Sequence, residues 1–220
     1  MNIKELCITK PGLLLDDDSF MSWFDKSSSV EDSLRKGSQD FHNLLFDKKS
    51  KDYLGDISEK KCLEIGFGGG RLLSEACNNF GHCTGIDIHD SFDRTKKILS
   101  DKLNFRLLHS DDIDLIETCS IDFVYSFIVF QHFTSWSVAE RYLEMIDRVL
   151  VDNGLAIIYF GRLDNGSIYV SPESNSNDWW MSMNVSKSYL EKELSKRFKV
   201  LEIDQRPGSK QIFARFKKNI

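Results

Sequence analysis

What this sequence lacks already narrows its class. The longest apolar stretches, such as residues 123–130, fall far short of the ~18 residues that a membrane span needs. The amino-terminal residues lack the apolar core of a secretory signal. With 41% apolar and 29% charged residues, the composition is that of a globular chain rather than a disordered one. We therefore expect a cytoplasmic protein that does not associate with membranes.

The sequence also lacks paired cysteines of the C-x-x-C type and an excess of basic residues. Its five cysteines are scattered, and no histidine or cysteine cluster has the spacing of a zinc site. Reduced, mostly buried thiols without a metal are the expectation. The net charge of −5 and the pI of about 5.6 argue against a wide basic surface for nucleic acid, although residues 196–199 include a local basic patch.

The first 60 residues differ in pattern from the rest of the chain. They include an aromatic group that looks exposed, formed by Phe20, Trp23 and Phe24. Ser28 followed by Glu31 has the spacing of a capping box, which predicts the start of a helix there. A polar linker is expected at 50–61. This pattern predicts a helical cap over residues 1–60, followed by a second domain at 61–220.

From residue 61 onward, predicted strands alternate with predicted helices. Strands are expected at 62–65, 84–88, 105–108, 121–128, 155–160, 199–204 and 211–216. Helices are expected at 71–79, 91–99, 137–150 and 188–197. Such alternation is typical of βαβ units with a parallel sheet, whereas the last two strands are joined by a turn too short for a crossover. The predicted fold is an α/β three-layer sandwich with a mostly parallel seven-stranded sheet whose last strand is antiparallel.

An insertion at 164–185 separates the fifth predicted strand from the last predicted helix. It carries four large aromatic or sulfur-containing side chains, Trp179, Trp180, Met181 and Met183. Such a cluster on a loop above the carboxyl edge of a sheet is typical of a substrate lid. The alternative, that these side chains fill a hydrophobic gap at the base of the loop, stays open.

The most informative segment is a glycine-rich loop between the first predicted strand and its helix. Glycines there allow a tight turn and a close approach of ligand to main chain, and the helix that follows directs free N–H groups to the same space. A dinucleotide fingerprint would need glycine where this chain has Arg71. The spacing is instead E-x-G-x-G-x-G. It resembles motif I of the class I S-adenosylmethionine-dependent methyltransferases, with its acid and glycines at Glu64, Gly66, Gly68 and Gly70.

The resemblance extends over about residues 61–216 and implies S-adenosylmethionine as the cofactor. Asp87 resembles the family's acid at the end of strand two, which holds the ribose hydroxyls, although it could instead be an acid at a helix start. Asp111 and Asp112 resemble the segment that contacts the adenine ring. Ser126, in the segment after the fourth-strand motif, is also expected to bind the cofactor.

His132 follows the fourth predicted strand, as a histidine often does in small-molecule members of this family. Its imidazole can accept a proton near pH 7. We expect it to act as a general base, against the alternative of an exposed loop residue. The other four histidines are expected at the surface or at strand ends, with no metal role; they are His42, His82, His89 and His109.

The resemblance implies an enzyme that methylates a small molecule, with oxygen preferred over nitrogen as the methylated atom. No Pro-Pro pair follows the fourth predicted strand, where family members that methylate planar amino groups carry one. The alternatives are N-methylation, a methyltransferase acting on protein or RNA, an NAD-linked oxidoreductase, and a cofactor-binding regulator without activity. The expected partner is a small-molecule substrate, with no nucleic acid.

Overall fold

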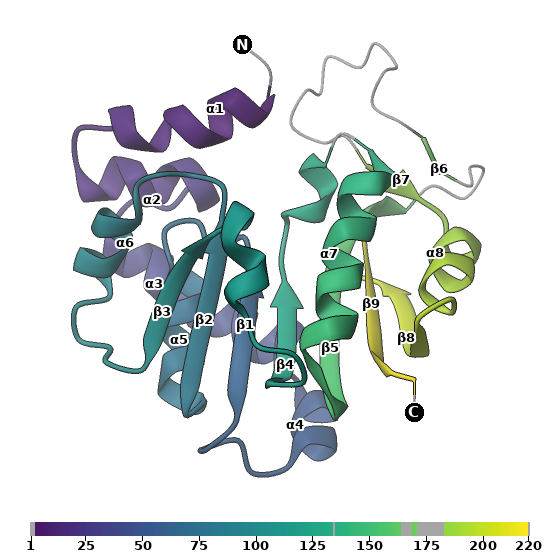
Figure 1. Cartoon of the computed structure of the whole chain (residues 1–220). Helices are drawn as coiled ribbons and strands as arrows, with labels where there is room; N and C mark the ends of the chain where they lie inside the picture. Colours follow the sequence, from purple (N-terminus) through teal and green to yellow (C-terminus); the bar gives the residue numbers. More distant parts are fainter. Residues whose placement is uncertain (1–2, 134, 164–168, 171–182, 220) are drawn as a thin grey trace. The chain divides into compact units, whose positions relative to one another are not determined.

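The computed structural model describes residues 3–133, 135–163, 169–170 and 183–219 (Figure 1). The chain divides into two compact units, Met1–Leu115 and Ile116–Ile220. Within the described ranges, every helix is too short or too polar to cross a membrane.

The first unit begins with short helices. They are α1 (Ile3–Thr9), η1 (Pro11–Leu13), α2 (Asp17–Asp25), α3 (Val30–Asp40), η2 (Phe41–Leu45) and α4 (Lys48–Leu54). The N-cap of α3 is Ser29, whose hydroxyl accepts from the Asp32 N–H over 3.1 Å, and not the predicted Ser28. Helix α4 occupies part of the predicted polar linker, because Asp47 caps it and it buries Leu54.

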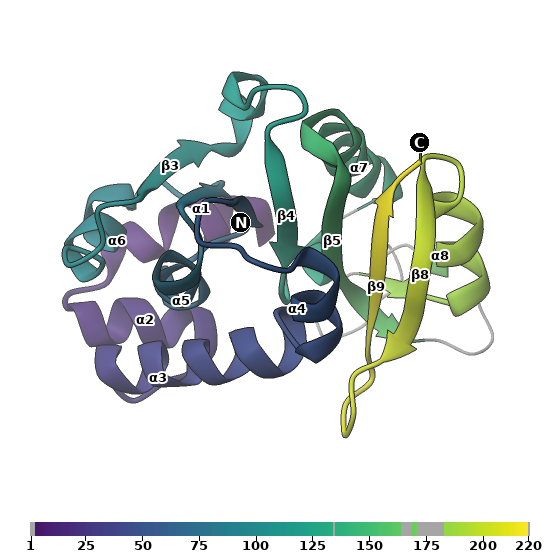
Figure 2. The same cartoon turned by 90° about the horizontal axis from the view of Figure 1, so that it is seen from below.

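The rest of the first unit is a parallel sheet with its helices. Its strands are β1 (Lys61–Ile65), β2 (His82–Asp87) and β3 (Phe105–His109), in the order β3-β2-β1. The connections contain α5 (Arg71–Asn79) and α6 (Phe92–Ile98), and η3 (Ser110–Leu115) follows β3. Helix α5 packs on β2, and α3 runs alongside α5 (Figures 1 and 2). This arrangement brings the N-terminal helices to the helix that follows the glycine loop.

The second unit is a mixed sheet with two helices. Its elements are β4 (Ile121–Ser126), η4 (Phe130–His132), α7 (Trp136–Val149), β5 (Leu150–Leu163), β6 (Tyr169–Val170), β7 (Asn184–Val185), α8 (Lys187–Leu194), β8 (Phe198–Gln205) and β9 (Gln211–Lys218). Strand β4 pairs with β5 in parallel, and β9 lies antiparallel between β5 and β8. The reversed last strand is therefore as predicted. The short strands β6 and β7 were not predicted; β7 pairs with β5 at the end of the insertion.

The thiols follow the prediction in part. Cys62, Cys77 and Cys83 are buried thiols, whereas Cys119 is exposed. The sulfur atoms of Cys62 and Cys83 lie 3.3 Å apart on neighbouring strands. Hydrogen bonding to Cys83 and burial together raise the pKa of Cys77 far above its usual range, and burial raises the pKa of Cys7 to about 11. Thiols with a raised pKa are poor nucleophiles, which gives these residues a packing role.

Candidate cofactor and catalytic site

The glycine loop connects β1 to α5. Gly66, Gly68 and Gly70 have φ values of 80°, 52° and 89°, a region that side chains rarely tolerate. The Gly66 N–H donates to the Ile86 carbonyl over 2.7 Å, which ties the loop to the end of β2. The backbone conformation alone therefore requires all three glycines of the predicted motif.

In this loop both backbone polar groups of Gly68 are hydrogen-bonded. Its N–H donates to Asp87 Oδ2 over 2.7 Å. Its carbonyl oxygen accepts from His89 Nε2 over 3.0 Å and from Thr95 Oγ1 over 3.2 Å. Asp87 is partly exposed, and a carboxylate offers about four acceptor sites. The Ile88 and His89 N–H groups also donate to Asp87 Oδ1, over 2.7 Å and 3.4 Å. Asp87 therefore holds the loop and keeps acceptor capacity for a ligand hydroxyl.

Sequence reasoning missed the part that His89 has in holding the loop. Of the two expected positions, the surface is wrong, because its side chain is fully buried, whereas His89 does follow the end of β2. The Ser91 N–H donates to its Nδ1 over 3.0 Å, so Nε2 carries the proton that bonds Gly68. Aromatic rings surround the imidazole, those of Phe20, Phe24, Phe67 and Phe92. The available sequence signal was its place two residues after the predicted ribose-binding acid.

The N-terminal segment packs directly on the glycine loop. A Cβ added to Gly68 would lie 2.9 Å from the Phe24 ring, and one added to Gly69 would overlap the Met21 sulfur. Both side chains come from α2. Phe20 is fully buried, which corrects the expectation of exposure for this member of the aromatic group, whereas Trp23 and Phe24 are partly exposed. Packing against α2 is thus a second reason for small residues in this loop.

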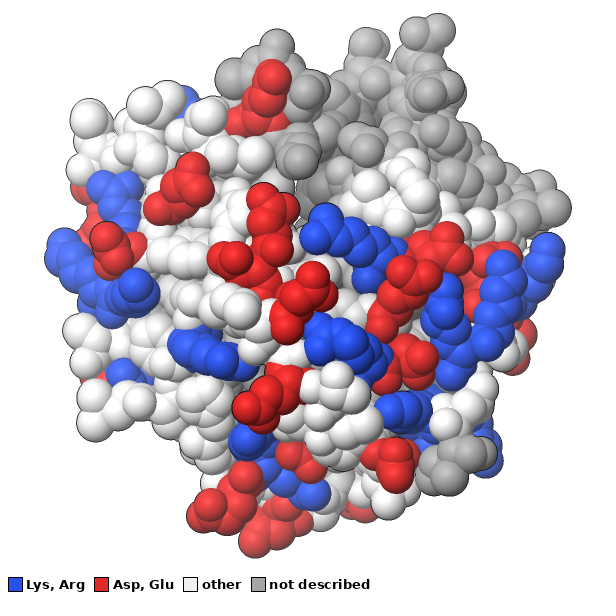
Figure 3. All heavy atoms as spheres, in the orientation of Figure 1, with Lys and Arg blue, Asp and Glu red and all other residues white. Residues whose placement is uncertain are grey.

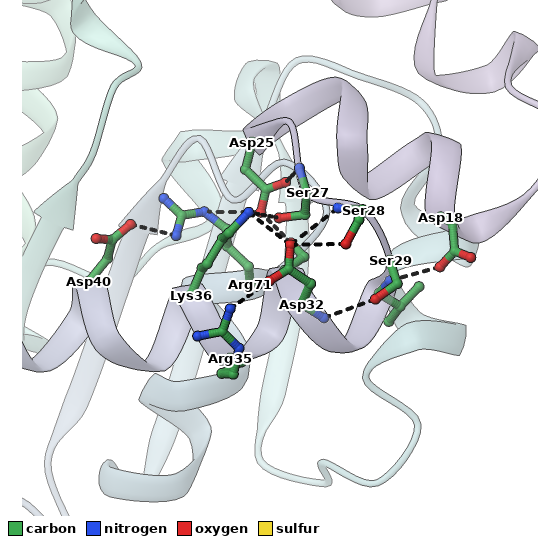
Figure 4. Close-up of polar contacts among 12 residues, drawn as sticks. Asp18, Asp25, Ser27, Ser28, Ser29, Asp32, Arg35, Lys36, Asp40 and Arg71 are labelled. Carbon is green, nitrogen blue, oxygen red and sulfur yellow. Dashed lines mark hydrogen bonds and ion pairs between the residues drawn. The ribbon is translucent and has the colours of Figure 1, made fainter.

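Arg71, the first residue of α5, joins the same two parts through ion pairs (Figure 4). Its guanidinium lies 2.8 Å from Asp40 Oδ2 and 3.7 Å from Asp25 Oδ2. The Ser33 hydroxyl also donates to Asp25. A Cβ added to Gly37 of α3 would overlap the Arg71 carbonyl. The arginine that replaces the dinucleotide-type glycine therefore anchors α2 and α3 to the start of α5.

The other acids predicted to bind the cofactor belong to the same unit. Glu64 is buried in β1, opposite Gly85 of β2. Asp111 and Asp112 are exposed in η3, directly after β3. Because parallel strands end at the same edge of a sheet, these two acids, the glycine loop and Asp87 share one edge. Their contacts with a cofactor stay predictions.

Two predicted site residues lie in the second unit. Ser126 is the last residue of β4, fully buried and opposite Ile158 of β5. His132 ends the short turn η4 and is partly exposed. Between them, Ile128 has a φ of 61°, which is rare for a β-branched residue. Ser126 therefore ends β4 and His132 follows it six residues later within this unit, and their roles stay predictions.

Most of the predicted lid lies outside the described residues, including Trp179, Trp180 and Met181. Met183 is described, and its side chain is fully buried. Its N–H donates to the Gln131 carbonyl over 3.1 Å, and its carbonyl accepts from the Arg162 N–H over 3.1 Å. At Met183 the segment therefore packs into the interior of the second unit.

A cavity of about 520 Å³ opens on the N-terminal segment. It is lined by Leu14, Asp18, Ser19, Ser22, Trp23, Ser27 and Ser28. Trp23, from the predicted aromatic group, thus faces this cavity. The lining contains none of the residues predicted to bind the cofactor, so the cavity is separate from the glycine loop.

A family model described as a methyltransferase domain matches residues 63–158. The matched range contains the glycine loop, Asp87, Asp111 and His132. No curated protein matches the sequence.

Solved structures of methyltransferases share the fold. The 1,6-didemethyltoxoflavin-N1-methyltransferase of Burkholderia thailandensis, with bound 1,6-didemethyltoxoflavin and S-adenosylhomocysteine, is 15% identical with a TM-score of 0.62, covering 90% of this chain and 81% of that chain. The N-methyltransferase NodS of Bradyrhizobium japonicum, in complex with S-adenosylhomocysteine, is 13% identical with a TM-score of 0.55, covering 87% and 99%. A putative methyltransferase in complex with the Haloferax volcanii Trm112 activator is 17% identical with a TM-score of 0.58, covering 92% and 99%.

The glycine motif, the observed strand pairing and these similarities lead to the same family. The α/β fold with mostly parallel strands and a reversed strand near its end is confirmed. S-adenosylmethionine is confirmed as the cofactor of the family. These findings support the class I S-adenosylmethionine-dependent methyltransferase family for this chain, whose residues 63–158 match a methyltransferase domain.

Proposed function

We propose that this methyltransferase acts on a small-molecule acceptor and methylates an oxygen atom. The observation that carries the cofactor half of the proposal is that Asp87 binds the Gly68 N–H while His89 binds the Gly68 carbonyl. The partly exposed carboxylate of Asp87 lies beside this held loop, and such an acceptor fits the ribose hydroxyls of a nucleoside.

The residues of the first unit would hold the cofactor. Asp87 would accept from the ribose hydroxyls, and Asp111 or Asp112 would accept from the adenine amino group. Glu64 and the glycines would shape the loop. Ser126 stays a proposed cofactor contact on the ground of its sequence motif alone. When bound, S-adenosylmethionine supplies an electrophilic methyl group on its sulfonium. The protein then mainly has to position the acceptor and exclude water.

His132 is the proposed base for the acceptor. A hydroxyl group must lose its proton to become a good nucleophile, and a positioned imidazole contributes typically 10²–10⁴-fold. An amine acceptor needs less help, because it requires only desolvation and loss of its proton. The proposal of O-methylation therefore depends on the activity of this one side chain.

N-methylation is the second candidate, since two of the similar structures are N-methyltransferases by name. The Trm112 complex raises the further alternative of a methyltransferase that works with an activator protein. On the face in Figure 3, acidic and basic side chains are interspersed rather than forming a continuous basic area. This distribution supports a small molecule over a nucleic acid as the acceptor.

Calorimetry followed by an acceptor screen tests the proposal. We expect micromolar-class binding of S-adenosylmethionine, about −8 kcal/mol, and transfer of labelled methyl groups to hydroxylated rather than amino metabolites. His132→Ala should lower turnover by about 10²–10⁴-fold with unchanged cofactor affinity, whereas the control His82→Ala, at the amino end of β2, should not. Label found only on amines, RNA or protein would overturn the proposed acceptor, and wild-type turnover of His132→Ala would overturn the base.

A further inference from the structure

A chain of side-chain contacts reaches His132 from the turn between β8 and β9. Arg206 Nη1 donates to Gln211 Oε1 over 3.1 Å. Gln211 Nε2 donates to Gln131 Oε1 over 3.3 Å. Gln131 Nε2 lies 3.1 Å from His132 Nε2. These contacts connect the β8–β9 hairpin, whose backbone Figure 2 shows, with the loop after β4 within the second unit.

The guanidinium at one end determines the direction of every bond in this chain. A guanidinium only donates hydrogen bonds, so the Gln211 atom that faces Arg206 is the carbonyl oxygen. The amide nitrogen of Gln211 then faces Gln131, which must present its own oxygen. Reversing either amide would bring two donors together, so the pattern of donors and acceptors fixes both orientations. The nitrogen of Gln131 consequently faces His132.

The His132 nitrogen that faces this amide must be an acceptor. In neutral imidazole one ring nitrogen accepts and the other carries the proton, so the lone pair lies on Nε2 and the proton on Nδ1. A protonated imidazole would direct an N–H at the N–H of Gln131. We propose that Arg206, Gln211 and Gln131 are positioning residues that fix His132 as the neutral tautomer protonated on Nδ1.

We call this chain of contacts, from Arg206 through Gln211 and Gln131 to His132, the relay. Both of its ends are held in place. The Arg206 guanidinium carbon lies 5.3 Å from the centroid of the Phe127 ring, and the Arg206 N–H donates to the Gln211 carbonyl over 2.7 Å. Gln131 is only 5% exposed, and its carbonyl accepts from the Met183 N–H. A buried amide left without partners is costly, which favours the connected arrangement over a loose surface contact.

The consequence for catalysis rests on the proposed function of His132 as a base. Nε2 is then the atom that takes the proton: the O–H bond of the acceptor breaks, an Nε2–H bond forms, and the electron pair stays on the acceptor oxygen. The acceptor hydroxyl must first displace the Gln131 amide from Nε2. Gln131 therefore keeps the base neutral and aligned until the acceptor arrives.

Imidazole nitrogen NMR of the ¹⁵N-labelled full chain tests the tautomer without cofactor or acceptor. The chain has five histidines, and the His132 signals are those lost in His132→Asn. We expect an unprotonated Nε2 and a protonated Nδ1 in the wild type. Gln211→Met should give a mixture of both tautomers, because it removes the link to Arg206. The control Lys210→Met, which removes a charge from the same turn, should keep the wild-type pattern.

Two further variants keep the test decisive if Gln211→Met fails to fold. Arg206→Lys retains a group that only donates and should preserve the tautomer, whereas Arg206→Met should relax it. A wild-type His132 protonated on Nε2, or an unchanged tautomer in both Gln211→Met and Arg206→Met, would overturn the relay. Because the measurement needs no turnover, failure of O-methylation and failure of the relay are separate results.

Discussion

The loop after β1 and the loop after β4 meet the same structural demand in different ways. Each continues the chain from the carboxyl end of a parallel strand. The first uses three glycines at positive φ, and both the N–H and the carbonyl of Gly68 are hydrogen-bonded. The second contains no glycine between residues 127 and 135 and takes a positive φ at Ile128 instead. In this loop the Gln131 side chain contacts the His132 ring.

This difference shows where each loop is sensitive to substitution. In the first loop the backbone itself is expected to contact the cofactor. A change at Gly68, or at the residues that hydrogen-bond to it, therefore alters the shape of the loop. In the second loop the functional group is the His132 side chain. Substitution of a partner such as Gln211 can therefore change which ring nitrogen carries the proton without moving the backbone. We therefore expect substitutions in the first loop to change its backbone shape, and substitutions around the second to change the state of one side chain.

The largest expected effect among substitutions that probe this contrast is at Asp87. Asp87→Ala should weaken S-adenosylmethionine binding at least tenfold, because hydrogen bonds to a charged group are worth about 1.5–3 kcal/mol. Asp87→Asn should lose less, since its amide oxygen can still accept from the Gly68 N–H. Asp90→Ala, which removes an exposed acid nearby, is the control. An unchanged dissociation constant for Asp87→Ala, measured by calorimetry, would exclude Asp87 from the site.

The same contrast explains what the sequence could predict. Glycine spacing is a local signal, so β1, the loop and α5 were predicted almost residue for residue. The partners of His89 and Gln211 lie 21 and 80 positions away in the chain, at Gly68 and Gln131. Contacts at such separation leave no periodic pattern, and a lone histidine or glutamine carries no motif.

The wrong local predictions, of a helix cap and of a linker, have a different cause. In the serine run before α3 every residue can serve as an N-cap, and the choice of Ser29 depends on which hydroxyl meets the Asp32 N–H. Helix α4 was interpreted as a linker because its sequence is mostly polar. It is stabilised by its Asp47 cap and by the burial of Ser50 and Leu54, which propensity alone does not reveal.

An intermediate effect, on the free energy of unfolding, is expected when a glycine of the first loop is substituted. Gly68→Ala and Gly208→Ala each place a side chain at positive φ, at 52° and 70°, which costs about 1–2 kcal/mol. Only at Gly68 would the new Cβ meet a neighbour, the Phe24 ring at 2.9 Å; around Gly208 nothing lies within 4 Å. Gly68→Ala should therefore lose about 1–3 kcal/mol more in free energy of unfolding. Equal losses in denaturant titrations would mean that α2 does not pack on the loop.

The smallest effect is expected at Ile128, and it should have the opposite sign to that at Gly68. Ile128→Gly removes the strain of a β-branched residue at positive φ, about 1–2 kcal/mol, but adds the entropic cost of glycine, about 0.5–1 kcal/mol. The net free energy of unfolding should be unchanged or slightly raised. Val129→Gly is the matched control, because Val129 is also partly exposed and β-branched but has an ordinary φ of −110°. It carries the cost of glycine without the relief, so it should be the less stable variant in thermal or denaturant unfolding. If both variants lost the same stability, Ile128 would not be strained, and the loop after β4 would owe its path to side-chain packing alone.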